Sequence, residues 1–166
     1  LANAVSVDGA CSEDAEGVVT IPADWTDIPW GAFRDCKDLK KVLIPAKIRE
    51  IKSYAFSSSG LEEIEFAAGS QLVSIGDYAF AYSKIVTIDI PSTVTSIGHG
   101  AFYEAKITEI QAWRILSTNI VIDSDTEECS GLTEIGDSAF SNSQKLKVVV
   151  RTGLRVFSVR TRSRFI

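Results

Sequence analysis

The apolar residues of this chain recur in a pattern with a period of about 23 residues. The dipeptide Ala-Phe occurs five times, at 32–33, 55–56, 79–80, 101–102 and 139–140. Chance placement of the Ala and Phe residues predicts only about one occurrence, so the five copies indicate an internal repeat. Each Phe has an Ile five residues earlier, and the Phe-to-Phe steps are 23, 24, 22 and 38 residues. The last step equals one period plus an insertion.

Two further sets of apolar positions keep the same period. After each Ala-Phe comes an apolar pair spaced three residues apart: Leu39/Val42, Leu61/Ile64, Ile85/Ile88, Ile107/Ile110 and Leu146/Val149. A second pair with the same spacing leads into each Ala-Phe: Trp25/Ile28, Ile48/Ile51, Leu72/Ile75, Val94/Ile97 and Leu132/Ile135. Each repeat therefore supplies one ring of apolar anchors.

The local pattern around these anchors predicts short strands. An apolar residue often stands two positions after the first pair and is followed by Pro, as in Ile44-Pro45 and Ile90-Pro91. Alternation of this kind fits a half-buried strand, and Pro ends it because Pro has no backbone N–H to donate. We expect Gly76, Gly98 and Gly136 to allow tight turns after the second pair.

One repeat of this length cannot bury its apolar ring alone, whereas stacked repeats bury their rings against each other. The pattern therefore predicts a β-rich solenoid of about five coils, with short parallel strands, few helices and a Phe closing the far side of each coil. We assign residues 1–17 to an acidic N-terminal arm, 18–150 to the solenoid with an insert at about 111–131, and 151–166 to a basic C-terminal extension.

Three segments resemble the BspA-like leucine-rich repeat family. They are Ile75-Gly-Asp-Tyr-Ala-Phe80, Ile90-Pro-Ser-Thr-Val-Thr-Ser-Ile-Gly98 and Phe33-Arg-Asp-Cys36-Lys-Asp-Leu39. The resemblance covers residues 18–150 and implies a leucine-rich-repeat solenoid wound as a right-handed superhelix. Cys36 keeps the Cys of the family motif, whereas the other repeats have small residues there: Ser59, Ser83, Ala105 and Ser143.

The resemblance also bears on function. Members of this family are solenoid proteins of cell surfaces, secretions and exported compartments, and they mostly bind other macromolecules. They share no catalytic residues, so the resemblance implies that this chain is not an enzyme and needs no cofactor. The expected function is an exported or surface-associated protein-protein interaction module.

A surface for such binding follows from the strand pattern. Residues between the inward apolar positions of each strand are expected to face the concave surface of the solenoid. The positions selected as partner-binding are Lys41, Glu63, Glu65, Thr87, Asp89, Glu109 and Gln111. Neighbouring strands lie about 4.8 Å apart, so the carboxylates would be close together. A basic partner segment would relieve their repulsion, while ordinary solvation of the face is the alternative.

The charge of the chain is unevenly distributed. The formal net charge is −5, but all 22 acidic residues lie in 1–144 together with 10 Lys and Arg, which gives 10 − 22 = −12 for that stretch. Residues 145–166 hold seven basic residues and no acidic one. An acidic body of this kind does not indicate a general nucleic-acid binder, and a basic tail predicts contact with something negative.

The tail alternates basic and uncharged residues, which in an extended strand places its guanidinium groups on one face. We predict a docking tail that meets a carboxylate-rich surface or a lipid headgroup layer. Its residues are Arg151, Arg155, Phe157, Arg160, Arg162, Arg164 and Phe165. The alternatives are a solvated terminus, a tail lying on the chain's own acidic body, and a cap on the last coil.

The three cysteines form no Cys-x-x-Cys unit, so they predict no metal site. In an oxidising compartment Cys11 and Cys36 would pair and staple the N-terminal arm to the first coil. Cys129 would then be free or would pair with one of them through the insert, and three free thiols are the remaining alternative. Asp123, Asp125, Glu127 and Glu134 mimic calcium-loop spacing, but Glu128 replaces the required Gly, which favours a solvated loop.

The remaining chemistry argues against catalysis. The single His, His99, stands at a turn position, and no Gly-x-Ser-x-Gly, phosphate-binding or dinucleotide-binding motif occurs. No apolar run is long enough to span a bilayer. Two function hypotheses remain: the interaction module described above, and a structural subunit of a larger membrane-associated complex on its lumenal side, for example in a thylakoid lumen.

Overall fold

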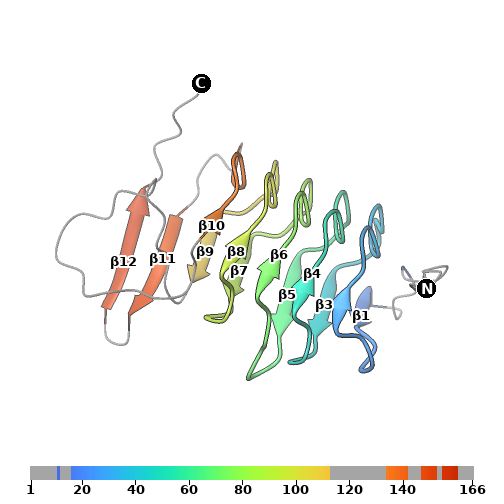
Figure 1. The fold of residues 1–166 in the computed structure, drawn as a ribbon. Coiled ribbons are helices and arrows are strands. Elements are labelled where there is room, and N and C mark those ends of the chain that lie inside the picture. The colour runs from blue at the N-terminus through green and yellow to red at the C-terminus, as the bar shows by residue number, and fades with distance from the viewer. Residues whose placement is uncertain (1–10, 12–15, 113–133, 142–146, 153–154, 161–166) are drawn as a thin grey trace.

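The computed structural model describes residues 11, 16–112, 134–141, 147–152 and 155–160, and its strands stack into a solenoid (Figure 1). Within these ranges there is no helix. The predicted β-rich solenoid is therefore confirmed. Each coil contains one longer strand, a turn, a two-residue strand and an Ala-Phe turn that leads to the next coil.

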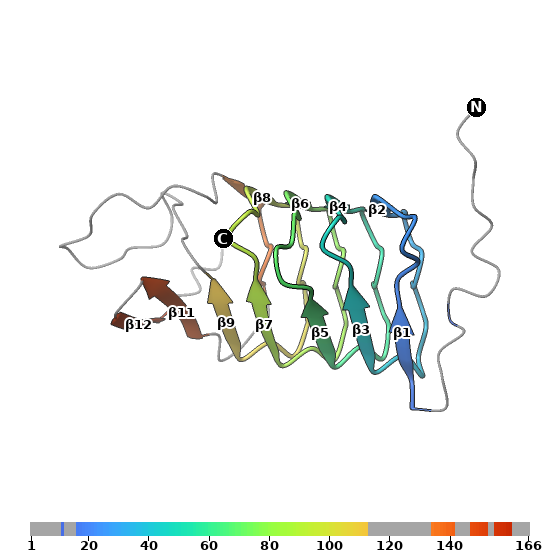
Figure 2. The same ribbon diagram turned by 90° about the horizontal axis from the view of Figure 1, so that it is seen from below.

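The strands form two rows on opposite walls of the solenoid (Figure 2). The long-strand row contains β1 (Val18–Thr20), β3 (Lys41–Ile44), β5 (Glu63–Phe66), β7 (Thr87–Ile90), β9 (Glu109–Ala112) and β11 (Lys147–Thr152). The short-strand row contains β2 (Asp27–Ile28), β4 (Glu50–Ile51), β6 (Ser74–Ile75), β8 (Ser96–Ile97) and β10 (Glu134–Ile135). Paired neighbours within each row run parallel.

The core lies between the two rows and consists of the repeating anchors. In β7 exposed and buried residues alternate, with Ile88 and Ile90 buried. This alternation follows from the two-residue period of a strand, which turns every second side chain inward. Pro45 and Pro91 follow β3 and β7 directly, as the sequence predicts.

A continuous column of Phe rings closes the coils at the Ala-Phe turns. Phe33, Phe56, Phe80, Phe102 and Phe140 stack with ring centroids 5.0, 5.2, 5.2 and 5.1 Å apart and interplanar angles of 7° or less. The backbone follows the column, since the amide of Phe80 donates to the carbonyl of Ala101 at 2.7 Å and that of Phe56 to Ala79 at 2.7 Å. The first four of these Phe side chains are fully buried.

The glycines after the short strands have a different role from the predicted one. A Cβ on Gly76, Gly98 or Gly136 would approach the backbone of the preceding coil within 2.6 Å or less, and none of the three has a positive φ. These positions need Gly because the coils approach closely there, so the expectation of a turn requirement was wrong. Positive φ occurs instead directly before each Ala-Phe, where Gly, Tyr or Ser stands: Gly31, Tyr54, Tyr78, Gly100 and Ser138.

The long-strand row is interrupted once. Ladders join β1-β3-β5 and β7-β9-β11-β12, but no ladder joins β5 to β7, whereas the five short strands form one continuous sheet. The loop from Phe66 to Leu72 is two residues longer than the corresponding loop from Ile44 to Ile48 and lacks the Pro. In Figure 1 this loop, green between β5 and β6, extends beyond its neighbours.

Beyond the last coil, β12 (Arg155–Arg160) pairs antiparallel with β11, with Lys147 opposite Arg160 and Thr152 opposite Arg155. The backbone of the C-terminal extension thus continues the sheet that β7, β9 and β11 form. Strand β11 crosses residue 150, where the sequence analysis places the end of the solenoid. The three domain boundaries stay predictions.

Candidate protein-binding surfaces

The outward positions of β3, β5 and β7 form one surface, which we call the long-strand face and which the sequence analysis assigns as concave. Its described side chains are Lys41, Leu43, Glu63, Glu65, Thr87 and Asp89. The three acidic residues and Thr87 are exposed, whereas Lys41 and Leu43 are half-buried. Glu109 and Gln111 lie in register beside Thr87 and Asp89, but their side chains lie outside the described set.

Lys41 links two of these carboxylates. Its Nζ lies 2.8 Å from Oε1 of Glu63 and 3.0 Å from Oε2 of Glu65. The hydrogen bonds to Glu63 and then Glu65 raise the pKa of Lys41 above its ordinary value. Asp89 has no ion pair among the described residues. The cation thus offsets charge on the β3 side of β5, and the side toward β7 stays acidic.

The interruption between β5 and β7 crosses this face. In the regular coils the amide of Glu62 donates to Lys40 O at 2.8 Å and that of Thr108 to Val86 O at 2.9 Å. In the described part of the chain no such bond joins the amide of Val86 to Glu62. Beside the interruption Ile64 and Phe66, the inward-facing residues of β5, are only half-buried against the core.

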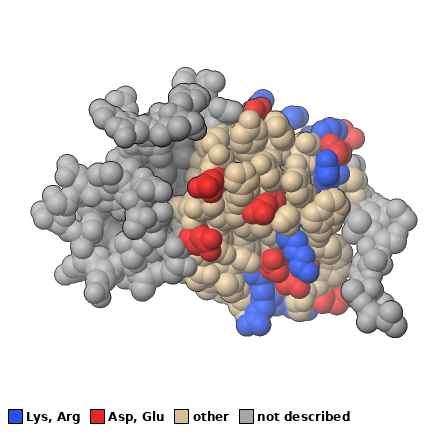
Figure 3. Space-filling model, turned by 45° about the horizontal axis from the view of Figure 1, so that its top comes forward, with Lys and Arg blue, Asp and Glu red and all other residues tan. Residues whose placement is uncertain are grey.

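A second surface lies at the Ala-Phe turns, which come toward the viewer in Figure 3. It is a row of five aromatic rings that we call the turn ridge: Trp30, Tyr54, Tyr78, Tyr103 and Tyr82. Successive centroids are 5.8, 5.3, 6.4 and 5.6 Å apart. Trp30 is 60% exposed and Tyr82 is 51% exposed. This ridge was not predicted from the sequence, although Tyr stands directly before Ala-Phe in two repeats.

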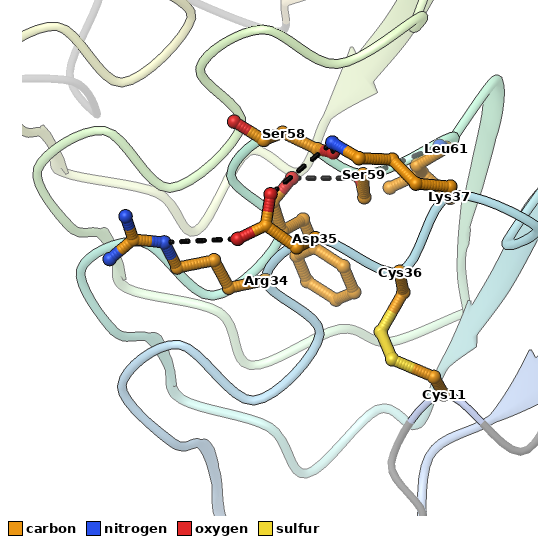
Figure 4. Close-up of polar contacts among 9 residues, drawn as sticks. Cys11, Arg34, Asp35, Cys36, Lys37, Ser58, Ser59 and Leu61 are labelled. Atoms are coloured by element: carbon orange, nitrogen blue, oxygen red, sulfur yellow. Dashed lines mark hydrogen bonds and ion pairs between the residues drawn. A yellow bond between two sulfur atoms is a disulfide. The ribbon is translucent and has the colours of Figure 1, made fainter.

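The first coil carries a disulfide between Cys11 and Cys36, whose Cα atoms are 5.3 Å apart (Figure 4). The bond attaches a residue of the N-terminal arm to the turn after Phe33. Cys36 is buried, and Ser59 fills the equivalent site in the next coil, where its hydroxyl donates to Phe56 O at 2.7 Å. Cys129 lies outside the described residues.

The predicted docking tail is described only in part. Arg151 lies in β11, and Arg155, Phe157 and Arg160 lie in β12, where the backbone register is defined but side chains are not. Arg162, Arg164 and Phe165 lie outside the described residues, as does the insert from residue 113 to its end. The docking role of the tail stays a prediction.

The described residues contain no group of three or more His, Cys, Asp or Glu side chains that could hold a metal ion. His99 is exposed in its turn, its amide donates to Oδ1 of Asp77 at 2.8 Å, and its ring meets Tyr78 edge-on. The described part of the chain has no helix long and apolar enough to cross a membrane.

The comparisons with known proteins agree with this geometry. The chain matches the family described as "BspA type Leucine rich repeat region", in six copies across residues 16–126. The Ala-Phe spacing gave about five repeats. No curated protein matches the chain.

Two solved structures share the fold. A leucine-rich repeat protein from Eubacterium ventriosum has a TM-score of 0.65 and 18% identity, covering 86% of this chain and 36% of that one. A leucine-rich repeat protein from Bacteroides ovatus has a TM-score of 0.58 and 25% identity, covering 80% of this chain and 37% of that one. This chain thus spans a little over a third of each relative.

Proposed function

Because the chain belongs to the BspA-type leucine-rich repeat family, we propose that it is a non-catalytic protein-interaction module that binds a basic polypeptide segment on the long-strand face. Solenoids of this family are typically non-catalytic and bind proteins. Beyond these family properties, we propose which surface of this chain binds, that the partner is basic, and that the protein is exported or surface-associated. The insert and the basic tail are further contact segments in it.

The observation that carries the proposal is the imbalance of charge on that face. Three exposed carboxylates, Glu63, Glu65 and Asp89, lie on this face, and Lys41 pairs with Glu63 and Glu65 only. Like charges on adjacent strands repel, and a partner cation placed between them relieves the repulsion.

The test reverses charge on the face and measures binding of a lysine-rich peptide by fluorescence anisotropy. The variant Glu65→Lys/Asp89→Lys should weaken binding by about tenfold or more at low salt, because it replaces attraction by repulsion. The matched control, Asp24→Lys/Asp38→Lys, makes the same change in net charge at two exposed residues off the face. Equal losses in both variants would show that only net charge matters and would refute the proposed site.

The structural-subunit hypothesis makes a different prediction about native material. A permanent subunit elutes with its complex in size exclusion, whereas a free interaction module elutes near the mass of its own polypeptide. The thylakoid form of that hypothesis has no support in the comparisons, and we do not adopt it. Crosslinking mass spectrometry on the same material would identify the residues that contact a partner.

A further inference from the structure

Three tyrosines of the turn ridge adopt a strained backbone conformation. Tyr54, Tyr78 and Tyr82 have φ values of 62°, 52° and 59°. A bulky residue in this left-handed region is strained, and Gly adopts it freely. The equivalent positions before Ala-Phe in the flanking coils are Gly31 and Gly100, both with positive φ. The fold therefore accepts Gly where two of the three tyrosines stand.

Removing the side chain before Ala-Phe would also open no hole in the core, because the core is formed by the Phe column behind the turn. The rings instead contact one another along the surface. Tyr54 and Tyr78 thus carry a backbone strain that Gly would avoid, which indicates that the ring cluster serves contacts outside the chain. Trp and Tyr in an exposed cluster are also the residues that most often dominate binding energy at protein interfaces.

The charge around the ridge specifies the sign of the partner. The described turn segments, 30–35, 53–58, 77–82, 99–104 and 137–141, contain one cation, Arg34, and four carboxylates, on Asp35, Asp77, Glu104 and Asp137. The Nζ of Lys37, just beyond the first segment, lies 3.2 Å from Oδ1 of Asp35, so the sum with Lys37 included and His99 neutral is 2 − 4 = −2. Glu104 also raises the pKa of Tyr103, mainly by a hydrogen bond. An electronegative strip of aromatic rings favours a cationic ligand.

The described residues include one example of this contact. The guanidinium carbon of Arg34 lies 5.5 Å from the centroid of the Tyr54 ring, while its Nε lies 3.5 Å from Oδ2 of Asp35. One arginine thus stacks on a ridge ring and pairs with a neighbouring carboxylate. A planar guanidinium suits both contacts at once, which a compact ammonium group does not.

Ring orientation argues against a glycan as the ligand. A sugar stacks on an open ring face, and a linear glycan needs several faces in one plane. Trp30 is tilted by 58° to Tyr54, and Tyr103 meets Tyr78 and Tyr82 at 68° and 73°. Tyr54 and Tyr78 cover each other's faces at 15°. The ridge presents edges and hydroxyl groups with two well-exposed rings, Trp30 and Tyr82, near its ends.

We infer that the turn ridge is a second docking surface, which binds an arginine-bearing polypeptide segment through Trp30 and Tyr82 and the carboxylates of Asp77 and Glu104. This surface lies at the Ala-Phe turns and uses none of the residues of the long-strand face. It distinguishes arginine from lysine, whereas the long-strand face responds to charge alone.

The experiment uses the full chain and two fluorescein-labelled twelve-residue peptides, one alternating Arg with Ser and the other Lys with Ser. Anisotropy titrations at physiological salt should show the Arg peptide binding about fivefold more tightly or better, because guanidinium stacking survives salt screening. The variant Trp30→Ala/Tyr82→Ala should lose this preference, so that its affinity for the Arg peptide falls by about fivefold, to that for the Lys peptide, which changes little. The control Val73→Ala/Val86→Ala removes two exposed apolar side chains off the ridge and should change neither.

A second variant separates binding from folding. Tyr54→Gly/Tyr78→Gly places the residue of Gly31 and Gly100 at both sites, so its thermal unfolding should stay cooperative while Arg-peptide affinity falls. Equal affinity for both peptides, or unchanged binding by Trp30→Ala/Tyr82→Ala, would overturn the inference. So would ridge-dependent binding of an oligosaccharide without binding of the Arg peptide. Glu65→Lys/Asp89→Lys should retain the preference for Arg over Lys, so the two docking surfaces fail independently.

Discussion

The two rows of strands arise from the same repeats, yet only one row is continuous. Five short strands form an uninterrupted ladder, whereas the long-strand row is divided between β5 and β7. Across that division the Phe rings keep their stacking, with 5.2 Å between Phe56 and Phe80 and 5.2 Å between Phe80 and Phe102. The Phe column and the short-strand ladder therefore continue past the point where the long-strand ladder is interrupted.

Spacing along the chain explains the difference. The distance from the short-strand Ile to the Phe is five residues in every repeat, so each short strand meets its neighbour in register. The step between long-strand anchors is 22 residues from Val42 to Ile64 but 24 from Ile64 to Ile88. Lys41 draws Glu63 and Glu65 toward β3, while Glu65 and Asp89 carry like charge across the division. The face that tolerates interruption is the face proposed to bind a partner.

The greatest loss of stability is expected when one ring is removed from the Phe column. Phe80→Ala should lower the free energy of unfolding by about 3–5 kcal/mol, because the ring is fully buried between two others. Phe66→Ala at the division should cost about 1–2 kcal/mol, since that ring is already half-exposed. Urea unfolding of both variants measures the contrast. Equal losses of unfolding free energy in the two variants would mean that the Phe column and the long-strand row contribute equally to stability.

A smaller contrast is expected between two glycines. Gly76→Ala places a Cβ 2.6 Å from the amide nitrogen of Ser53 in the preceding coil and should cost about 1–3 kcal/mol. Gly69, in the long loop after β5, has open space around it and a φ of +75°, so Gly69→Ala should cost only about 1 kcal/mol from strain. Thermal denaturation of the pair checks the order, and a reversed order would contradict the close approach of the short-strand coils.

How far the sequence alone predicts this molecule differs between its parts. The five Ala-Phe pairs predicted the stacked Phe column, and the alternation in Thr87–Ile90 predicted a half-buried strand. The interruption was not predicted, because Ile64-Glu65-Phe66 has the same apolar pattern as the other strands and only the 24-residue step marked it. The turn ridge was missed because its rings meet through left-handed turns, which no apolar periodicity reveals.

Shortening the loop after β5, so that β5 can pair with β7, should raise the stability of the protein by a moderate amount. Deleting Ala68 and Gly69 together with Phe66→Ile and Ala67→Pro copies the Ile-Pro steps at 44–45 and 90–91. We expect β5 to pair with β7 and stability to rise by about 1 kcal/mol, the net value of one or two hydrogen bonds. Amide exchange of Thr87 and Asp89 reports the pairing. Unchanged exchange in the remodelled protein would show that loop length is not the cause.

The smallest expected effect compares two buried serines at the same position of successive coils. Ser59 donates to Phe56 O at 2.7 Å and accepts from the amide of Leu61, so Ser59→Ala should cost about 1 kcal/mol. Ser83 Oγ is buried with no hydrogen-bond partner in the described structure, so Ser83→Ala should be neutral or slightly stabilising. Chemical denaturation resolves the two, and a greater loss for Ser83→Ala would contradict the difference.

Hydrogen exchange of two amides in the third coil distinguishes the continuous Phe column from the interrupted long-strand ladder. The amide of Phe80 donates to Ala101 O at 2.7 Å behind the stacked rings, whereas Val86, six residues later, lacks the bond to the preceding coil that its counterparts make. Residue-resolved exchange by NMR should show Phe80 exchanging only with global unfolding and Val86 exchanging about a hundredfold faster or more. Equal protection of the two amides would contradict the account, because it would mean that the long-strand ladder is as continuous as the Phe column.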